Sequence, residues 1–146
     1  MITVEKLIEK KGSQVWSIST EATVFDSIRL MDEKGVGALA VVIEDSLVGI
    51  ISERDYARKV IIKDRSSKET KVKDIMTREV YHAVPDQGID ECLISMNKHK
   101  IRHLPVMAGK KLVGMISVGD LVKEIIQDQK YTIKQLENSM TWEESF

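Results

Sequence analysis

Residues 49–55 read Gly-Ile-Ile-Ser-Glu-Arg-Asp, and 65 positions later residues 114–120 read Gly-Met-Ile-Ser-Val-Gly-Asp. The similarity extends outward without a gap, because residues 15–60 align with residues 80–125 and ten of these 46 pairs are identical. Self-similarity at a fixed offset indicates repeated copies of one structural unit. A unit of about 60 residues buries little surface when alone, so we expect the two copies to fold together as one body.

Each copy predicts the order strand, helix, strand, strand, helix. In the first copy Val24, Ile28 and Met31 recur at helical spacing. Thr23 precedes this stripe as an N-cap, and Gly35 follows it as a C-terminal stop. The segments predicted as strands are residues 14–18, 38–43 and 47–51 in the first copy and residues 79–83, 104–107 and 112–116 in the second. Two such β-α-β-β-α repeats define an α/β fold of the α+β kind.

The repeats predict a division of the chain into four parts. Residues 1–63 hold the first repeat with a helical N-terminal segment, and residues 64–73 form a polar connector. Residues 74–127 hold the second repeat, and residues 128–146 form a helical extension that ends in a polar tail over residues 141–146.

Composition excludes several classes of protein. The formal net charge is -1, whereas a dedicated nucleic-acid binder normally carries a basic excess. The single cysteine, Cys92, excludes an internal disulfide framework and reads as a buried small hydrophobe. No apolar run approaches the roughly 20 residues of a membrane span, and residues 1–12 lack the apolar centre of a signal peptide. We therefore expect a cytoplasmic protein that does not associate with membranes.

The two copies of Gly-apolar-apolar-Ser-x-x-Asp, each after a two-strand hairpin and opening a helix, resemble tandem CBS domains, a pair often called a Bateman module. Supporting signals are Asp-Ile-Met-Thr at residues 74–77, Pro85, and Arg-His-Leu-Pro-Val at residues 102–106. Residues 51–60 are especially similar to stand-alone bacterial members. The resemblance covers roughly residues 4–127.

The resemblance implies a regulatory sensor rather than an enzyme. Members pack their two repeats through the small sheets, form dimers and bind adenosine nucleotides in clefts between the repeats. AMP is the leading candidate ligand, with NAD(H), ADP, ATP or S-adenosylmethionine as alternatives. Binding would signal by conformational change, to an unidentified protein partner where one exists.

The repeated acidic residues suit the sugar of such a ligand. One carboxylate accepts a hydrogen bond from each of two adjacent ribose hydroxyls, so Asp55 and Asp120 are the candidate ribose readers. Ser52 and Ser117 precede these aspartates at the start of the predicted helices, where free backbone N–H groups attract phosphate. The alternative is that each serine and aspartate only caps its helix.

The two clefts are expected to differ. In related modules the position of Arg102 and His103 supplies phosphate contacts, which the equivalent Gly37 and Ala38 cannot do. By family analogy, the Ser52 and Asp55 cleft is completed by Pro85, Ile101, Arg102 and His103, and the Ser117 and Asp120 cleft by Thr20, Val36, Gly37 and Ala38. The first cleft is therefore predicted to be the better phosphate site. Alternatively, Arg102 and His103 are solvated or salt-bridged residues at the start of a strand and bind no phosphate.

Cations gather beside the first cleft. Arg54 and Arg58 are four residues apart on one predicted helix and would embrace a phosphate together. Residues 53–73 carry eight cations against four anions, which indicates either the rim of a site for an anionic ligand or a solvated face.

Trp16 and Tyr81 occupy equivalent positions in the two repeats, and they either pack near a base or lie at the edge of the core. The histidines lack metal-ligand spacing.

Three other functions compete with nucleotide sensing. The runner-up is a structural or oligomerisation module whose clefts are degenerate and empty. A small enzyme is disfavoured because no nucleophile and base stand out. Nucleic-acid binding through residues 53–73 would predict strongly salt-dependent affinity.

Overall fold

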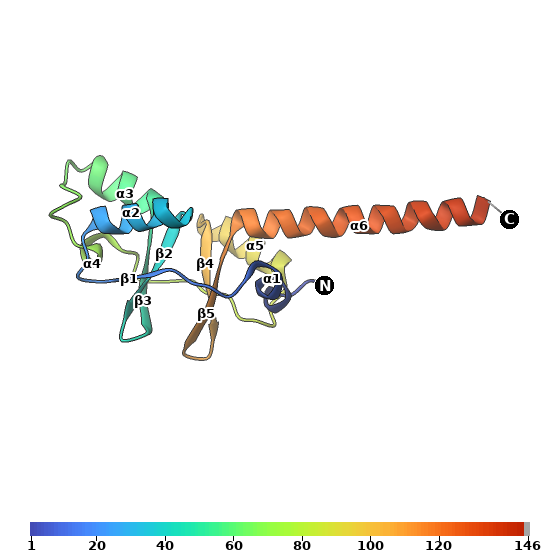
Figure 1. The fold of residues 1–146 in the computed structure, drawn as a ribbon, viewed down its shortest axis with the longest axis horizontal. Helices are drawn as coiled ribbons and strands as arrows, with labels where there is room; N and C mark the ends of the chain where they lie inside the picture. Colours follow the sequence, from blue (N-terminus) through green and yellow to red (C-terminus); the bar gives the residue numbers. More distant parts are fainter. Residues whose placement is uncertain (145–146) are drawn as a thin grey trace.

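The computed structural model describes residues 1–144 and shows two similar halves joined side by side (Figure 1). In the first half β1 (Ser17–Ser19) runs parallel to β2 (Ala38–Ile43), which pairs antiparallel with β3 (Ser46–Ser52). Glu44 and Asp45, both with positive φ, form the hairpin turn between β2 and β3. The two hairpin strands lie where the sequence predicted them.

The second half repeats the hairpin as β4 (His103–Ala108) and β5 (Lys111–Ser117). Both hairpins carry a register shift at the same place in the repeat, after Val41 and after Val106. The strand predicted over residues 79–83 is absent from this described segment, which pairs with β4 only through an isolated bridge at Ala83. β3 and β5 contact each other, so the two sheets meet along these strands.

The helix that precedes the first hairpin begins and ends as its sequence predicts. α2 (Val24–Lys34) is capped by Thr23, whose side chain accepts a hydrogen bond from the Asp26 backbone at 3.1 Å. Gly35 ends α2 in the left-handed conformation, with φ 65°. α5 (Ile89–His99) ends the same way at Lys100, although this residue has a side chain.

The helices that follow the hairpins differ between the halves. α3 (Glu53–Tyr56) continues as a π-helical segment, η1 (Ala57–Ile61), in which the Ile62 N–H bonds the carbonyl five residues earlier. α6 (Val118–Glu144) is instead one long α-helix that projects from the body (Figure 1). The last two residues of the predicted polar tail lie outside the described residues. Within residues 1–144, no helix combines the length and the apolarity needed to cross a membrane.

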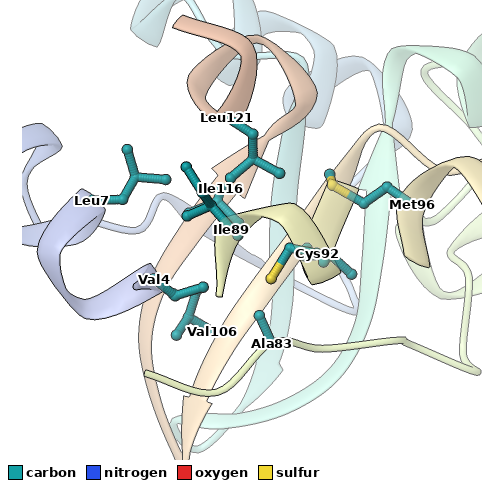
Figure 2. Close-up of a cluster of buried hydrophobic side chains, with 10 residues drawn as sticks. Val4, Leu7, Ala83, Ile89, Cys92, Met96, Val106, Ile116 and Leu121 are labelled. Atoms are coloured by element: carbon teal, nitrogen blue, oxygen red, sulfur yellow. The ribbon is translucent and has the colours of Figure 1, made fainter. Parts of the chain in front are cut away.

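The two short helices α1 and α4 are exchanged between the halves. The helix that precedes the first repeat in the sequence packs on the second half, and the helix that precedes the second repeat packs on the first half. Val4 and Leu7 of α1 (Val4–Lys11) lie in the core of the second half with Ile116 and Leu121 (Figure 2). In the same way, Val72 and Ile75 of α4 (Val72–Ile75) lie in the core of the first half, although α4 opens the second repeat in the sequence. The packing of the two halves is therefore crossed with respect to the sequence order.

The motif glycines are the points where these exchanged segments approach. A Cβ at Gly114 would lie 2.7 Å from Cδ1 of Ile8 in α1. A Cβ at Gly49 would lie 2.7 Å from the Met76 sulfur and 2.9 Å from the Thr77 carbonyl oxygen, directly after α4. Glycine at both positions lets a neighbouring segment pack against the hairpin, which explains this part of the repeated motif.

Candidate functional site

Most of the predicted site residues lie in two clefts between the halves of the described chain. The larger one, called here the Ser52 cleft, has a volume of about 550 Å³. Its walls come from the junction of β3 and α3 in one half and from the segment between α5 and β4 in the other. The lining residues are Gly37, Ile50, Ser52, Glu53, Arg54, Asp55, Thr77, Lys100, Ile101, Arg102 and His103.

A capping box fixes the carboxylate of Asp55 at this cleft. Oδ2 of Asp55 accepts hydrogen bonds from the Ser52 backbone N–H at 3.0 Å and from the Ser52 hydroxyl at 3.1 Å. Oδ1 lies 3.0 Å from the Lys59 ammonium and 3.4 Å from the Thr77 hydroxyl. The capping role is thus real, and it holds the carboxylate in one orientation at the cleft wall.

Cations from both halves surround the Ser52 cleft. Nη1 of Arg54 donates to the carbonyl oxygen of Lys100 at 2.7 Å, which ties α3 to the end of α5. Lys100 and Arg102 stand on the opposite wall. A smaller pocket of about 300 Å³ adjoins the cleft and shares with it Arg54, Lys100, Ile101 and Arg102. The cleft therefore offers Asp55 as one acceptor and three cations as donors.

The second cleft, called here the Ser117 cleft, has a volume of about 410 Å³. It lies at the junction of β5 and α6, where the loop between α2 and β2 and the end of α1 close it. The lining residues are Lys11, Gly12, Gln14, Trp16, Gly35, Val36, Gly37, Ala38, His103, Met115, Ser117 and Asp120.

Asp120 repeats the capping geometry and gains a cation from α1. Its Oδ2 accepts from the Ser117 backbone N–H at 2.8 Å and lies 2.5 Å from the Lys11 ammonium. Burial alone would raise the pKa of Asp120, but the hydrogen bonds from Lys11 and Ser117 outweigh it, so the pKa is lowered. Among the described residues, the hydrogen bonds of this carboxylate fall on Oδ2.

His103 lines both clefts. Its ring packs against Gly37, where a Cβ would lie 3.3 Å from Cε1 of the imidazole. Burial lowers the pKa of His103, and the positive charges of Lys11 and Arg102 lower it further, whereas Asp120 opposes them. The folded protein therefore favours the neutral form of this imidazole.

Most of the predicted site residues line one of the two clefts, and their role in nucleotide binding stays a prediction. In the Ser52 cleft Ser52, Arg54, Asp55, Ile101, Arg102 and His103 come together, and in the Ser117 cleft Val36, Gly37, Ala38, Ser117 and Asp120 do so.

Thr20 and Pro85, which are equivalent in the repeat, do not line the clefts. The carbonyl of Thr20 accepts from the Lys73 N–H at 3.1 Å, and that of Pro85 accepts from the Glu5 N–H at 2.8 Å. Both residues hold the exchanged helices α4 and α1 instead. Arg58, in the π-helical segment η1, is exposed and also lies outside the lining of the Ser52 cleft.

Sequence reasoning missed several lining residues. Lys11 precedes the repeats in the chain and carried no signal, because only the exchange of α1 brings it to the Ser117 cleft. Thr77 closes the Ser52 cleft and belongs to the Asp-Ile-Met-Thr segment that supported the family resemblance. Trp16 lines the Ser117 cleft, with the Lys34 ammonium 4.4 Å from its ring centroid, whereas Tyr81 stacks on His99 away from both clefts.

Two pseudosymmetric α/β repeats with clefts between them define a tandem-repeat fold. A family model of the CBS domain matches residues 4–62 and 72–127, so the chain belongs to the CBS-domain family and holds a pair of these repeats. The α/β fold and the resemblance read from the sequence are thereby confirmed.

Individual relatives agree with this assignment. The chain is 40% identical over 130 residues to CBS domain-containing protein CBSX3, mitochondrial, of Arabidopsis thaliana. That match covers 86% of this chain but only 63% of the plant protein, so the chain spans less than two thirds of this curated relative.

Solved structures show the same architecture. A putative signal-transduction protein with CBS domains from Burkholderia ambifaria superposes with a TM-score of 0.84 at 48% identity, covering 88% of this chain and 96% of that one. The CBS domain pair of protein MJ0100, solved with 5′-methylthioadenosine and S-adenosyl-L-methionine, superposes with a TM-score of 0.78. It covers 88% of this chain and 98% of that one at 22% identity, which establishes a shared fold only.

Proposed function

We propose that this chain is a regulatory module that binds an adenosine nucleotide in the Ser52 cleft and signals by a change of shape. The observation that carries the proposal is that Asp55 lines the same cleft as Arg54, Lys100 and Arg102, which outnumber the two anions there, Asp55 and Glu53. A fixed carboxylate suits the two ribose hydroxyls, and cations suit the phosphate. The volume of about 550 Å³ falls in the range of small-molecule sites.

AMP is the ligand that the cleft is proposed to prefer, with NAD(H) or ATP as alternatives. The Ser117 cleft is proposed as the weaker site, because Lys11 alone supplies a lining lysine or arginine there. The adenosine compounds named for the MJ0100 structure motivate this class of ligand. A ligand that touches both halves shifts their arrangement only if it binds one arrangement more tightly.

The test is a panel of AMP, ADP, ATP, NAD(H) and S-adenosylmethionine, measured by thermal shift and isothermal titration calorimetry. We expect at least one adenosine compound to bind and Asp55→Asn to weaken its binding about tenfold or more, since hydrogen bonds to charged groups contribute about 1.5–3 kcal/mol. Asparagine keeps an oxygen for the Ser52 N–H, so the variant preserves the helix cap.

Asp120→Asn is the matched control, because it makes the same change in the equivalent capping box. It should weaken the same binding less than Asp55→Asn. Equal effects would remove the proposed difference between the clefts. Absence of binding by every compound in the panel would favour the second candidate, an oligomerisation module with empty clefts.

A further inference from the structure

The outer part of α6 packs on nothing else in the described chain. Leu121 is fully buried in the core of the second half, and Ile125 packs against that core. Beyond this base, every residue from Gln127 to Met140 is exposed, and Figure 1 shows the helix projecting freely. The CBS-domain match ends at residue 127, so this part of the helix lies outside the family's repeats.

A stripe of large apolar side chains follows one side of this helix. Their exposed fractions lie between 40% and 61%. They are Val122, Ile126, Ile133, Leu136 and Met140. With Gln129 included, the separations alternate between four and three residues over the whole stripe. This spacing is the heptad seam of a coiled coil, not the wider face of a helix that packs on a globular body.

A helix of this length needs a partner for its apolar side. Helices derive most of their stability from the packing of an amphipathic face, and isolated helices shorter than about 12–15 residues are marginal in water. The 27-residue α6 has packing only at its base. A row of exposed apolar residues this long marks an interaction surface.

The seam fits a second copy of the same helix. In heptad terms the a positions are Ile126, Ile133 and Met140, and the d positions are Val122, Gln129 and Leu136. Isoleucine at a with leucine at d favours two parallel strands. Gln129 is the polar residue within the seam, and only in a parallel, in-register pair does it meet its own counterpart and satisfy its amide.

The charges agree with self-association. Between residues 127 and 140 the helix carries Asp128 and Glu137 against Lys130 and Lys134, so two copies side by side have no net repulsion. In the parallel register Lys130 faces Ile125 of the second copy, and the lysine stem extends the apolar contact.

We propose that two copies of this chain associate through a parallel, in-register coiled coil formed by residues 122–140 of α6. The nucleotide-binding clefts take no part in this contact, so the proposal stands independently of the proposed function.

Cysteine cross-linking of the full chain tests the pairing and its register. Gln129→Cys should form a disulfide-linked dimer under mild oxidation, because its counterpart lies directly opposite. Tyr131→Cys is the matched control, since Tyr131 is also exposed on α6, at 64%, but lies off the seam. The unmodified chain, whose Cys92 is buried, should remain uncross-linked.

A second substitution ties the cross-link to the seam. In the Gln129→Cys chain, Ile133→Lys should reduce the rate of cross-linking at least tenfold, whereas Tyr131→Lys should leave it unchanged. Equal cross-linking through residues 129 and 131, no cross-linking through residue 129, or insensitivity to Ile133→Lys would each overturn the proposal. A mixed disulfide between Val122→Cys and Met140→Cys chains would overturn it too, since it requires antiparallel helices.

Discussion

The ammonium of Lys11 lies 2.5 Å from Oδ2 of Asp120 and also donates to the Met115 carbonyl oxygen at 2.6 Å. A residue from the N-terminal helix thus reaches the candidate ribose reader of the second repeat. The ammonium beside Asp55 belongs instead to Lys59 of the same repeat, and Lys59 does not line the Ser52 cleft. The two carboxylates therefore differ in which helix supplies the paired cation, and the two clefts differ in how many cations line them.

Lys11→Met should weaken binding of phosphate-bearing nucleotides at the Ser117 cleft and leave the Ser52 cleft unchanged. The variant removes the lysine of this cleft, and without its hydrogen bond the pKa of Asp120 should rise. Two-site calorimetry with AMP measures the affinities. Lys6→Met, on the exposed side of the same helix, makes the same charge change as a control. Tighter binding by Lys11→Met would contradict the expectation and show that Lys11 competes with the ligand for Asp120.

Arg102→Gln should separate phosphate binding from nucleoside binding. Arg102 lines the Ser52 cleft, and hydrogen bonds to charged groups contribute about 1.5–3 kcal/mol. We therefore expect AMP affinity to fall about tenfold or more and adenosine affinity to change little, both measured by calorimetry. Arg58→Gln is the matched control, because Arg58 is exposed and outside the cleft. A comparable loss of AMP affinity from Arg58→Gln would instead support the sequence prediction that Arg54 and Arg58 bind the phosphate together.

Gly49→Ala should destabilise the protein more than Gly114→Ala. At Gly49 the new Cβ meets the Thr77 backbone, which exchanges hydrogen bonds of 2.9 and 3.0 Å with Ile50 and has little freedom to move. At Gly114 it meets the flexible end of Ile8. Overpacking of this kind costs about 1–3 kcal/mol, and Gly114→Ala should lie below that range. Urea denaturation gives both free energies of unfolding, and the reverse order would contradict the exchanged packing.

The repeated motif carried most of the fold because it combines local signals with a fixed offset. Thr23, Gly35 and Ser52 act through hydrogen bonds to residues a few positions away, so their caps are legible in sequence. The left-handed end of α5 can be predicted only from the alignment of Lys100 with Gly35, since lysine rarely adopts that conformation.

The unpredicted features are those that depend on distant chain segments. Nothing local indicates that Leu7 packs in the second half or that Lys11 reaches Asp120, because the exchange of α1 and α4 is a tertiary event. The strand expected at residues 79–83 failed for a similar reason. Its backbone hydrogen bonds to β4 are confined to Ala83, and Pro85 is engaged with α1 instead.

Acidification should destabilise the ligand-free protein through His103. Burial and the nearby charges of Lys11 and Arg102 lower the pKa of this imidazole in the folded state, and Asp120 opposes them only in part. Because the unfolded state keeps a pKa of about 6.5, it binds more protons than the folded state once the pH falls below that value. The free energy of unfolding should therefore decrease as the pH is lowered through the folded pKa. His103→Gln should flatten this dependence, whereas His82→Gln, at an exposed site, should not. Urea denaturation between about pH 7.5 and pH 5.5 measures this dependence.

AMP at saturation should reduce the loss of stability on acidification, since a phosphate beside His103 favours the imidazolium. An equal loss with and without AMP would show that the phosphate does not approach His103.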